Sequence, residues 1–219
     1  MRNHFREPGE LSRRIHHFAR GLWCLLLTGG LLGPVLHASQ VKLVDLEQMT
    51  RRAGRIFSGR CTGARVVTDP ALGRDVTVAT FHVERAIKGV TGSTVTVRML
   101  GAAAAGGRAT GLPAGIPTFR PGDDVILFLY GESAQGLSSP VGLGQGRFSV
   151  RTDKQGHRRA VNDFGNSNLL SGLRSDLRDR LRDPHVASPT GRVSPQRDDL
   201  DPDALLDVVA TLVAGQPGQ

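Results

Sequence analysis

The stretch from Val76 to Ile87 has the side-chain alternation of a long β-strand, and it limits the fold of this chain more than any other feature. Successive side chains of a strand point to opposite faces of its sheet. The order therefore places Val76, Val78, Thr80, His82 and Glu84 on one face, and Thr77, Ala79, Phe81, Val83 and Arg85 on the other. A sheet with one polar and one apolar face is typical of antiparallel β proteins.

Five further segments predict strands, and they are joined by short connections rich in glycine and proline. They cover residues 56–67, 93–100, 124–130, 146–152 and 157–162, with a hairpin turn at residues 153–156 and a long surface loop at 101–118. No long helix separates them, which favours an antiparallel barrel or sandwich. We expect a mainly β domain over residues 39–163, a small OB-like barrel of about six strands. The apolar strand patterns predict Phe57, Phe81, Phe128 and Phe148 as core residues.

Helices are expected at both ends of this domain. Residues 41–55 predict a short amphipathic helix, and residues 164–183 a second one whose apolar side carries Leu169, Leu170, Leu173, Leu177 and Leu181. Residues 184–200 have the composition of a flexible linker. Residues 201–219 predict a last amphipathic helix over Pro202–Ala214, capped by Asp201, with a short tail.

The first 38 residues have the layout of a secretory signal peptide. Five arginines precede the apolar stretch Gly21–Leu36, and Ala38 offers a small residue for cleavage. The stretch is short for a membrane span, which needs about 20 apolar residues. A signal anchor and a misassigned start codon remain open as alternatives, and the twin-arginine route is less favoured than the general one. We expect an exported protein, periplasmic or secreted, without a stable membrane span after cleavage.

Removal of residues 1–38 would leave a basic chain with one cysteine. The formal charge falls from +8 to +5, and Cys61 is the only cysteine that remains. One cysteine cannot close an internal disulfide, so an apolar core must hold the domain together. The positive charge suits acidic partners such as lipid headgroups, envelope sugars or nucleic acid. An arginine-rich surface with no specific partner is the favoured explanation, because no block of consecutive basic residues exists beyond Arg51-Arg52 and Arg158-Arg159 in this part of the chain.

Within residues 51–151, about half of the chain, four segments resemble the strands of exported bacterial domains with an OB-type barrel. They are residues 55–60, 79–89, 94–98 and 119–129. Such domains are similar to the netrin-like modules of tissue inhibitors of metalloproteinases. Those inhibitors present a free N-terminal cysteine, held by disulfides, to a catalytic zinc. Here Cys61 lies inside a predicted strand without a partner, so the resemblance implies a fold and no inhibitory residue.

Several residue patterns are candidates for reactive sites. His82 and Glu84 share a strand face and suit a metal or a proton shuttle, and Cys61 with His82 or His157 suits a nucleophile and its base. The glycines of 142–146 do not form a phosphate loop, because a strand follows them. The acidic run 198–203 lacks the glycine and distal Glu of a calcium loop. We therefore assign no catalytic, metal or cofactor residue and expect no cofactor.

The sequence thus predicts a non-catalytic binding protein whose partner is another exported or envelope macromolecule and not nucleic acid. Its contact surfaces are expected in loop 101–118 and on the apolar stripes of the two C-terminal helices. An inhibitor of an exported protease is the first alternative, and a small thiol- or metal-dependent enzyme is the second.

Overall fold

The computed structural model describes residues 42–103, 109–110, 117–181 and 200–216. The predicted signal peptide (1–38), most of loop 101–118 and most of the linker 184–200 lie outside these residues. Within the described part, no helix has the length and apolar character needed to cross a membrane.

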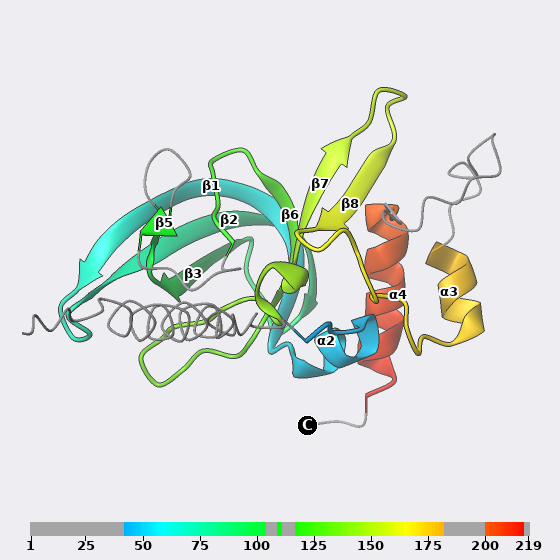
Figure 1. Ribbon diagram of the computed structural model, residues 1–219, viewed down its shortest axis with the longest axis horizontal. Coiled ribbons are helices and arrows are strands. Elements are labelled where there is room, and N and C mark those ends of the chain that lie inside the picture. Colours follow the sequence, from blue (N-terminus) through cyan, green and yellow to red (C-terminus); the bar gives the residue numbers. More distant parts are fainter. Residues whose placement is uncertain (1–41, 104–108, 111–116, 182–199, 217–219) are drawn as a thin grey trace, which may run out of the picture. The chain divides into compact units, whose positions relative to one another are not determined.

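The centre of the fold is a six-stranded antiparallel sheet in the order β3-β2-β1-β6-β7-β8 (Figure 1). Its strands are β1 (Arg55–Asp69), β2 (Arg74–Lys88), β3 (Thr94–Leu100), β6 (Asp124–Leu129), β7 (Arg147–Thr152) and β8 (Arg158–Asn162). A separate pair, β4 (Ala102–Ala103) and β5 (Ala109–Thr110), lies in the predicted loop. All six predicted strands are confirmed. The sheet is not closed in the described residues, so the barrel stays a prediction.

Three helices accompany the sheet: α2 (Leu46–Arg52), α3 (Ser175–Leu181) and α4 (Pro202–Ala214). The helix α2 begins where the Asp45 side chain accepts the N–H of Gln48 at 2.7 Å, and it is shorter than the predicted 41–55. The helix α4 matches its prediction, and Asp201 accepts the N–H groups of Asp203 and Ala204. These caps satisfy N–H groups that have no partner inside the helix.

The predicted helix over 164–183 is wrong in its first half. Residues 163–172 form a series of turns, in which Asn166, Asn168, Gly165 and Gly172 have positive φ. A right-handed helix cannot contain such residues. The helix begins only at Ser175, although Leu169, Leu173, Leu177 and Leu181 are all buried as expected.

The sheet packs a separate apolar core on each face. The helix-side core lies between the sheet and α2, α3 and α4, and includes Ile126, Phe128, Phe148, Leu206 and Val209. The loop-side core on the other face includes Phe57, Cys61, Phe81, Phe119 and Leu127. The strand β6 contributes alternate residues to both cores and is therefore buried on both of its faces. The four predicted core phenylalanines are fully buried.

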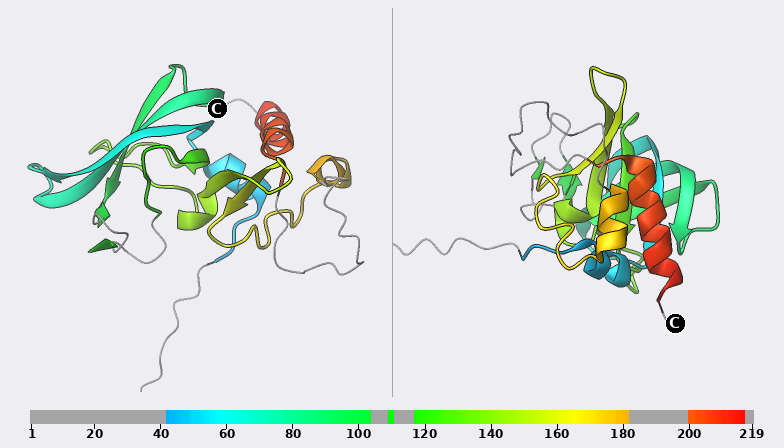
Figure 2. Two further views of the ribbon diagram at one scale, coloured as in Figure 1. Left: turned by 90° about the horizontal axis from the view of Figure 1, so that it is seen from above. Right: turned by 90° about the vertical axis from the view of Figure 1, so that its right-hand side faces the viewer.

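The same packing overturns one prediction about contact surfaces. The apolar stripes of α3 and α4 were expected to bind a partner, but Leu177, Leu181, Leu205 and Leu206 are buried in the helix-side core. Figure 2 shows α4 (red) lying against the sheet in two further views. These stripes stabilise the domain itself and are not available for binding.

Candidate functional site

The hairpin formed by β7 and β8 is the most basic element of the described chain. Residues 147–162 contain five arginines and lysines and one aspartate, a formal charge of +4. Residues 39–219 carry +5 in all. Figure 1 shows the outer part of this hairpin (yellow-green) extending beyond β6 and α4. The excess positive charge is therefore concentrated on one exposed element.

The register of the hairpin divides its side chains between two faces. Phe148 lies opposite Asn162, Val150 opposite Ala160, and Arg151 opposite Arg159. Phe148, Val150 and Ala160 belong to or pack on the helix-side core. Because neighbouring side chains alternate, Arg151 and Arg159 face the other side of the sheet. They share that face with Arg147, Ser149 and Val161.

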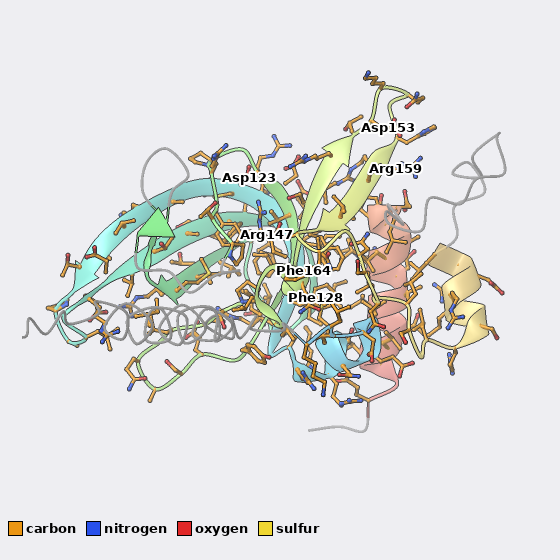
Figure 3. All side chains as sticks on the ribbon, in the orientation of Figure 1. Asp123, Phe128, Arg147, Asp153, Arg159 and Phe164 are labelled. Carbon is orange, nitrogen blue, oxygen red and sulfur yellow. The ribbon has the colours of Figure 1, made fainter. Side chains whose placement is uncertain are left out.

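At the base of the hairpin, Arg147 joins three segments of the chain. Its guanidinium lies 3.4 Å from Asp123 and 3.3 Å from Asp163. The guanidinium carbon also lies 5.5 Å from the centre of the Phe119 ring, which is within cation–π range. The side chain is only 14% exposed. Arg147, at the position shown in Figure 3, therefore fixes the base of the hairpin and is not free to bind a partner.

At the tip, Asp153 organises the turn that the sequence predicts at residues 153–156. Its carboxylate accepts the N–H groups of Gln155 at 2.9 Å and His157 at 2.8 Å, and lies 3.2 Å from Nε of Arg159. Burial disfavours the charged form, but these hydrogen bonds outweigh it and lower the pKa of Asp153. Asp153 thus stays ionised and holds the tip in one conformation.

The five basic side chains of the hairpin differ in whether they have acidic partners. Arg147 has Asp123 and Asp163, Arg159 has Asp153, and Arg158 lies 3.5 Å from Asp203 at the start of α4. Arg151 and Lys154 form no ion pair or hydrogen bond with any described residue. Both are exposed. They are the two cations of the hairpin that remain available to a ligand.

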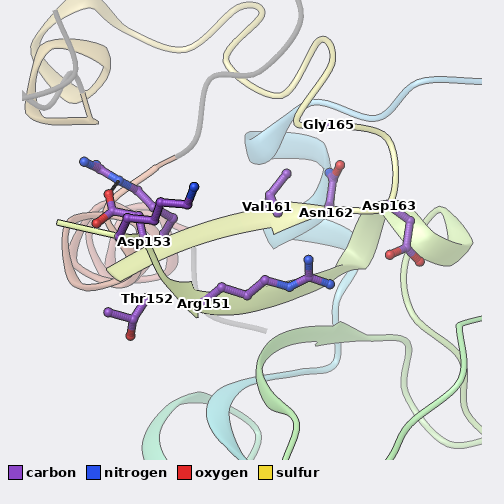
Figure 4. Close-up of a pocket in the computed structure, with 9 residues that line it drawn as sticks. Arg151, Thr152, Asp153, Val161, Asn162, Asp163 and Gly165 are labelled. Carbon is purple, nitrogen blue, oxygen red and sulfur yellow. Dashed lines mark hydrogen bonds and ion pairs between the residues drawn. The ribbon is translucent and has the colours of Figure 1, made fainter. Parts of the chain in front are cut away.

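A cleft of about 740 Å³ lies along the hairpin, and Figure 4 shows it in close-up. Its volume is in the range of small-molecule sites. The lining residues are Arg151, Thr152, Asp153, Lys154, Arg159, Val161, Asn162, Asp163 and Gly165. The cations come from the outer part of the hairpin, and Asn162, Asp163 and Gly165 come from its base. Figure 4 shows the Arg151 side chain extending along the hairpin toward Asp163 and away from Asp153. The base of the cleft therefore combines a cation with the partly exposed carboxylate of Asp163.

The structure does not bring together the residues that the sequence suggests as a nucleophile and its base. Cys61 pairs in register with Phe81 and is buried in the loop-side core, whereas His82 pairs with Arg60 and is exposed. Cys61 and His82 therefore point to opposite faces of the sheet. His157 lies at the hairpin tip beside Asp153. Burial raises the pKa of the Cys61 thiol, which is the opposite of what a nucleophile requires.

The remaining candidates have structural roles in the described residues. His82 and Glu84 share an exposed face, but the described part of the chain contains no group of three or more His, Cys, Asp or Glu that could hold a metal ion. Leu143–Gly146 forms a short 3-10 turn before β7, and Asp201 caps α4. Asp198 and Asp199 lie outside the described residues.

Sequence reasoning missed the hairpin as a candidate site, although part of the signal was present. A turn centred between Asp153 and His157 pairs residue 151 with residue 159 by simple counting outward. The same counting places Asp163 opposite Arg147. The other partners, Asp123 of Arg147 and Asp203 of Arg158, come from distant segments, and no local pattern predicts them. Searches for similar proteins add nothing to this picture: no protein-family model, curated protein or solved structure matches the chain.

Proposed function

We propose that this chain is an exported, non-catalytic binding protein and that the β7–β8 hairpin is its binding element. The observation that carries the proposal is the concentration of positive charge on one exposed hairpin, where Arg151 and Lys154 have no acidic partner in the described chain. Exposed cations of this kind attract and orient acidic partners.

The fixed geometry of the hairpin supports this proposal. Arg147 holds its base through Asp123 and Asp163, and Asp153 holds its tip through hydrogen bonds to the turn. A binding element that is ordered before it meets its partner loses little conformational entropy on binding. A loop without such contacts would have to become ordered at that moment.

Export rests on the N-terminal sequence. The basic head, the apolar stretch Gly21–Leu36 and the small residue Ala38 support cleavage before Ser39. Mass spectrometry of protein recovered outside the cytoplasm should find Ser39 at the N-terminus. Recovery of the intact N-terminus on protein inside the cell would overturn this part of the proposal.

The OB-like barrel and the resemblance to netrin-like domains are part of the same proposal. Their support is a backbone hydrogen bond of 2.8 Å from Ser138, in the segment after β6, to the carbonyl oxygen of Arg98 on β3. This bond joins the segment after β6 to β3, the strand at one edge of the sheet. Slow hydrogen exchange at the Ser138 amide would support closure, and fast exchange would contradict it.

Site-specific photocrosslinking in the exporting cell tests the binding element. A photoreactive residue replaces Thr152 or Gln155 on the hairpin, and matched controls replace Thr94 or Thr96 on β3. All four positions are polar, uncharged and exposed. We expect adducts from the two hairpin positions and none from the controls. Equal yields at all four positions, or adducts from β3 alone, would overturn the assignment of the hairpin.

The two alternatives from the sequence stay predictions. An inhibitor of an exported protease would abolish that protease's activity on mixing. A thiol enzyme would need a Cys61 that reacts in the native protein.

A further inference from the structure

The cleft beside the hairpin contains an unbalanced pair of like charges. Arg151 lies directly opposite Arg159 across the β7–β8 ladder, on the same face. Like charges in this position destabilise a hairpin. Asp153 compensates Arg159 at 3.2 Å, but no described residue compensates Arg151. An anionic group beside Arg151 would relieve the repulsion, and Lys154, nearer the tip, lines the same cleft.

The base of the cleft also contains an acidic side chain. Asp163, whose side chain is 40% exposed, lines it together with Gly165. One carboxylate oxygen of Asp163 lies 3.3 Å from Arg147. An ionised carboxylate accepts several hydrogen bonds, so the rest of this group can accept from hydroxyls. A second negative group on the ligand would be repelled here.

We propose that this cleft binds an acidic sugar unit of a polysaccharide, with the oxyanion group at Arg151 and the neighbouring hydroxyls near Asp163. The inference rests on the proposed function, because it names the partner of the same hairpin. One anionic group beside several hydroxyls matches a cleft lined by three cations, in which the Arg151 side chain extends toward the partly exposed carboxylate of Asp163. The volume of about 740 Å³ accommodates a unit of this size.

Other acidic partners match the lining less well. Among the described residues, no aromatic side chain lines the cleft, whereas single-stranded nucleic acid is bound by stacking on aromatic residues. The tip Asp153–His157 has no apolar side chain that could enter a lipid layer. Asp153 and Asp163 would also repel polyphosphate, in which the charged groups follow one another directly along the polymer.

Calorimetric titration of the protein as recovered from the exporting cell tests the chemistry. The probe is oligogalacturonate, which carries one carboxylate and free hydroxyls on each sugar. Three comparison ligands separate the contributions. The methyl ester of oligogalacturonate has the hydroxyls without the charge, and polyphosphate has the charge without sugar hydroxyls. Vesicles with anionic lipids present charged headgroups on a membrane surface. We expect the acid to bind about tenfold or more tightly than the ester, because a charge-assisted contact is lost. Polyphosphate and vesicles should bind more weakly than the acid.

Two variants locate the site. Arg151→Gln should weaken oligogalacturonate binding by about tenfold or more, since the uncompensated guanidinium is removed. Arg65→Gln is the matched control, because Arg65 is also exposed on a strand and has no partner among the described residues. It should bind as the unaltered protein does. An equal loss in both variants would show general attraction to positive charge and overturn the site.

The outcomes separate the two levels of the proposal. If photocrosslinking marks the hairpin but the acid and the ester bind equally, the binding element stands and the acidic sugar is wrong. If polyphosphate or vesicles bind more tightly than the acid, the partner is a different polyanion or a membrane surface. If the acid binds without loss in Arg151→Gln, the cleft is not its site.

Discussion

Asn162 and Asn166 exchange hydrogen bonds: each backbone N–H donates to the side-chain oxygen of the other residue at 2.9 Å. Their amide groups then donate to the carbonyl oxygens of Gln145 and Ala160, at 3.1 and 3.0 Å. Both residues are 5% exposed. This network joins the end of β8 to the turn before β7 and to the turns after β8, and so fixes the base of the basic hairpin.

Removal of the Asn162 side chain should destabilise the protein. Asn162→Ala leaves buried N–H and C=O groups without partners, and we expect a loss of about 2–3 kcal/mol in the free energy of unfolding. Urea denaturation measures it from the shift in midpoint at unchanged slope. Gln155→Ala at the exposed tip is the control and should stay close to the original stability. A loss below about 0.5 kcal/mol would contradict this account of the network.

Asn166 should show a second, separable effect of backbone conformation. Its φ is +58°, a value that glycine adopts without strain and alanine does not. Asn166→Gly and Asn166→Ala both remove the side-chain hydrogen bonds, so the difference between them reports the backbone. We expect the alanine variant to be less stable by about 1 kcal/mol in the same urea assay. Equal stability would mean that the turn adjusts its backbone.

Two glycines of β1 should differ in how much stability the protein loses when each is replaced by alanine. A Cβ at Gly59 would overlap the carbonyl oxygen of His82 on the paired strand, and that backbone cannot move aside without breaking the β1–β2 ladder. A Cβ at Gly63 would meet no atom within 4 Å. We expect Gly59→Ala to cost about 3 kcal/mol or more and Gly63→Ala to cost less than about 1 kcal/mol. Thermal unfolding of the pair measures the difference.

The thiol of Cys61 should be unreactive in the native protein. Cys61 is 1% exposed, its Sγ lies 3.5 Å from the carbonyl oxygen of Gly63, and burial raises its pKa. A thiol reagent needs an accessible thiolate. Labelling should therefore be negligible without denaturant and reach one thiol per molecule of the cleaved protein in urea. Rapid labelling of the native protein would restore Cys61 as a candidate nucleophile.

The strands were predictable because their signals are local. Alternating side chains and flanking glycine, proline and aspartate depend only on neighbours in sequence. The predicted strands 56–67 and 76–87 are therefore close to β1 and β2, which extend only one to two residues further at each end. The first half of the helix predicted over 164–183 was wrong because Leu169, Leu173, Leu177 and Leu181 recur every four residues, the spacing of a helix face. Burial requires only that these side chains reach the helix-side core. The turns before α3 bring Leu169 and Leu173 into that core as well as a helix would.

The candidate site was less predictable than the fold. The turn at residues 153–156 follows from its composition, and the pairing of Arg151 with Arg159 follows from the turn. The pairing of Arg147 with Asp163, directly after β8, follows from the same register. Which other cations stay unpaired depends on Asp123 and Asp203, which approach from the segment before β6 and from α4. Such contacts between distant segments are set by the packing of the whole domain.

The last prediction concerns Asp69, which closes the turn between β1 and β2. The N–H of Leu72 lowers the pKa of Asp69 most, and the N–H of Ala71 and the guanidinium of Arg98 lower it further against the opposing effect of burial. A carboxyl whose pKa is lower in the folded state adds stability above its unfolded pKa of about 4, and this stability is lost as the pH falls through the folded value. Asp69→Asn should therefore be less stable at neutral pH and lose less stability on acidification below about pH 4. Urea titrations across this range measure it, with Asp176→Asn, at an exposed position of α3, as the control for loss of one charge. Parallel stability curves for Asp69→Asn and the original protein below pH 4 would show that Asp69 does not contribute to acid sensitivity.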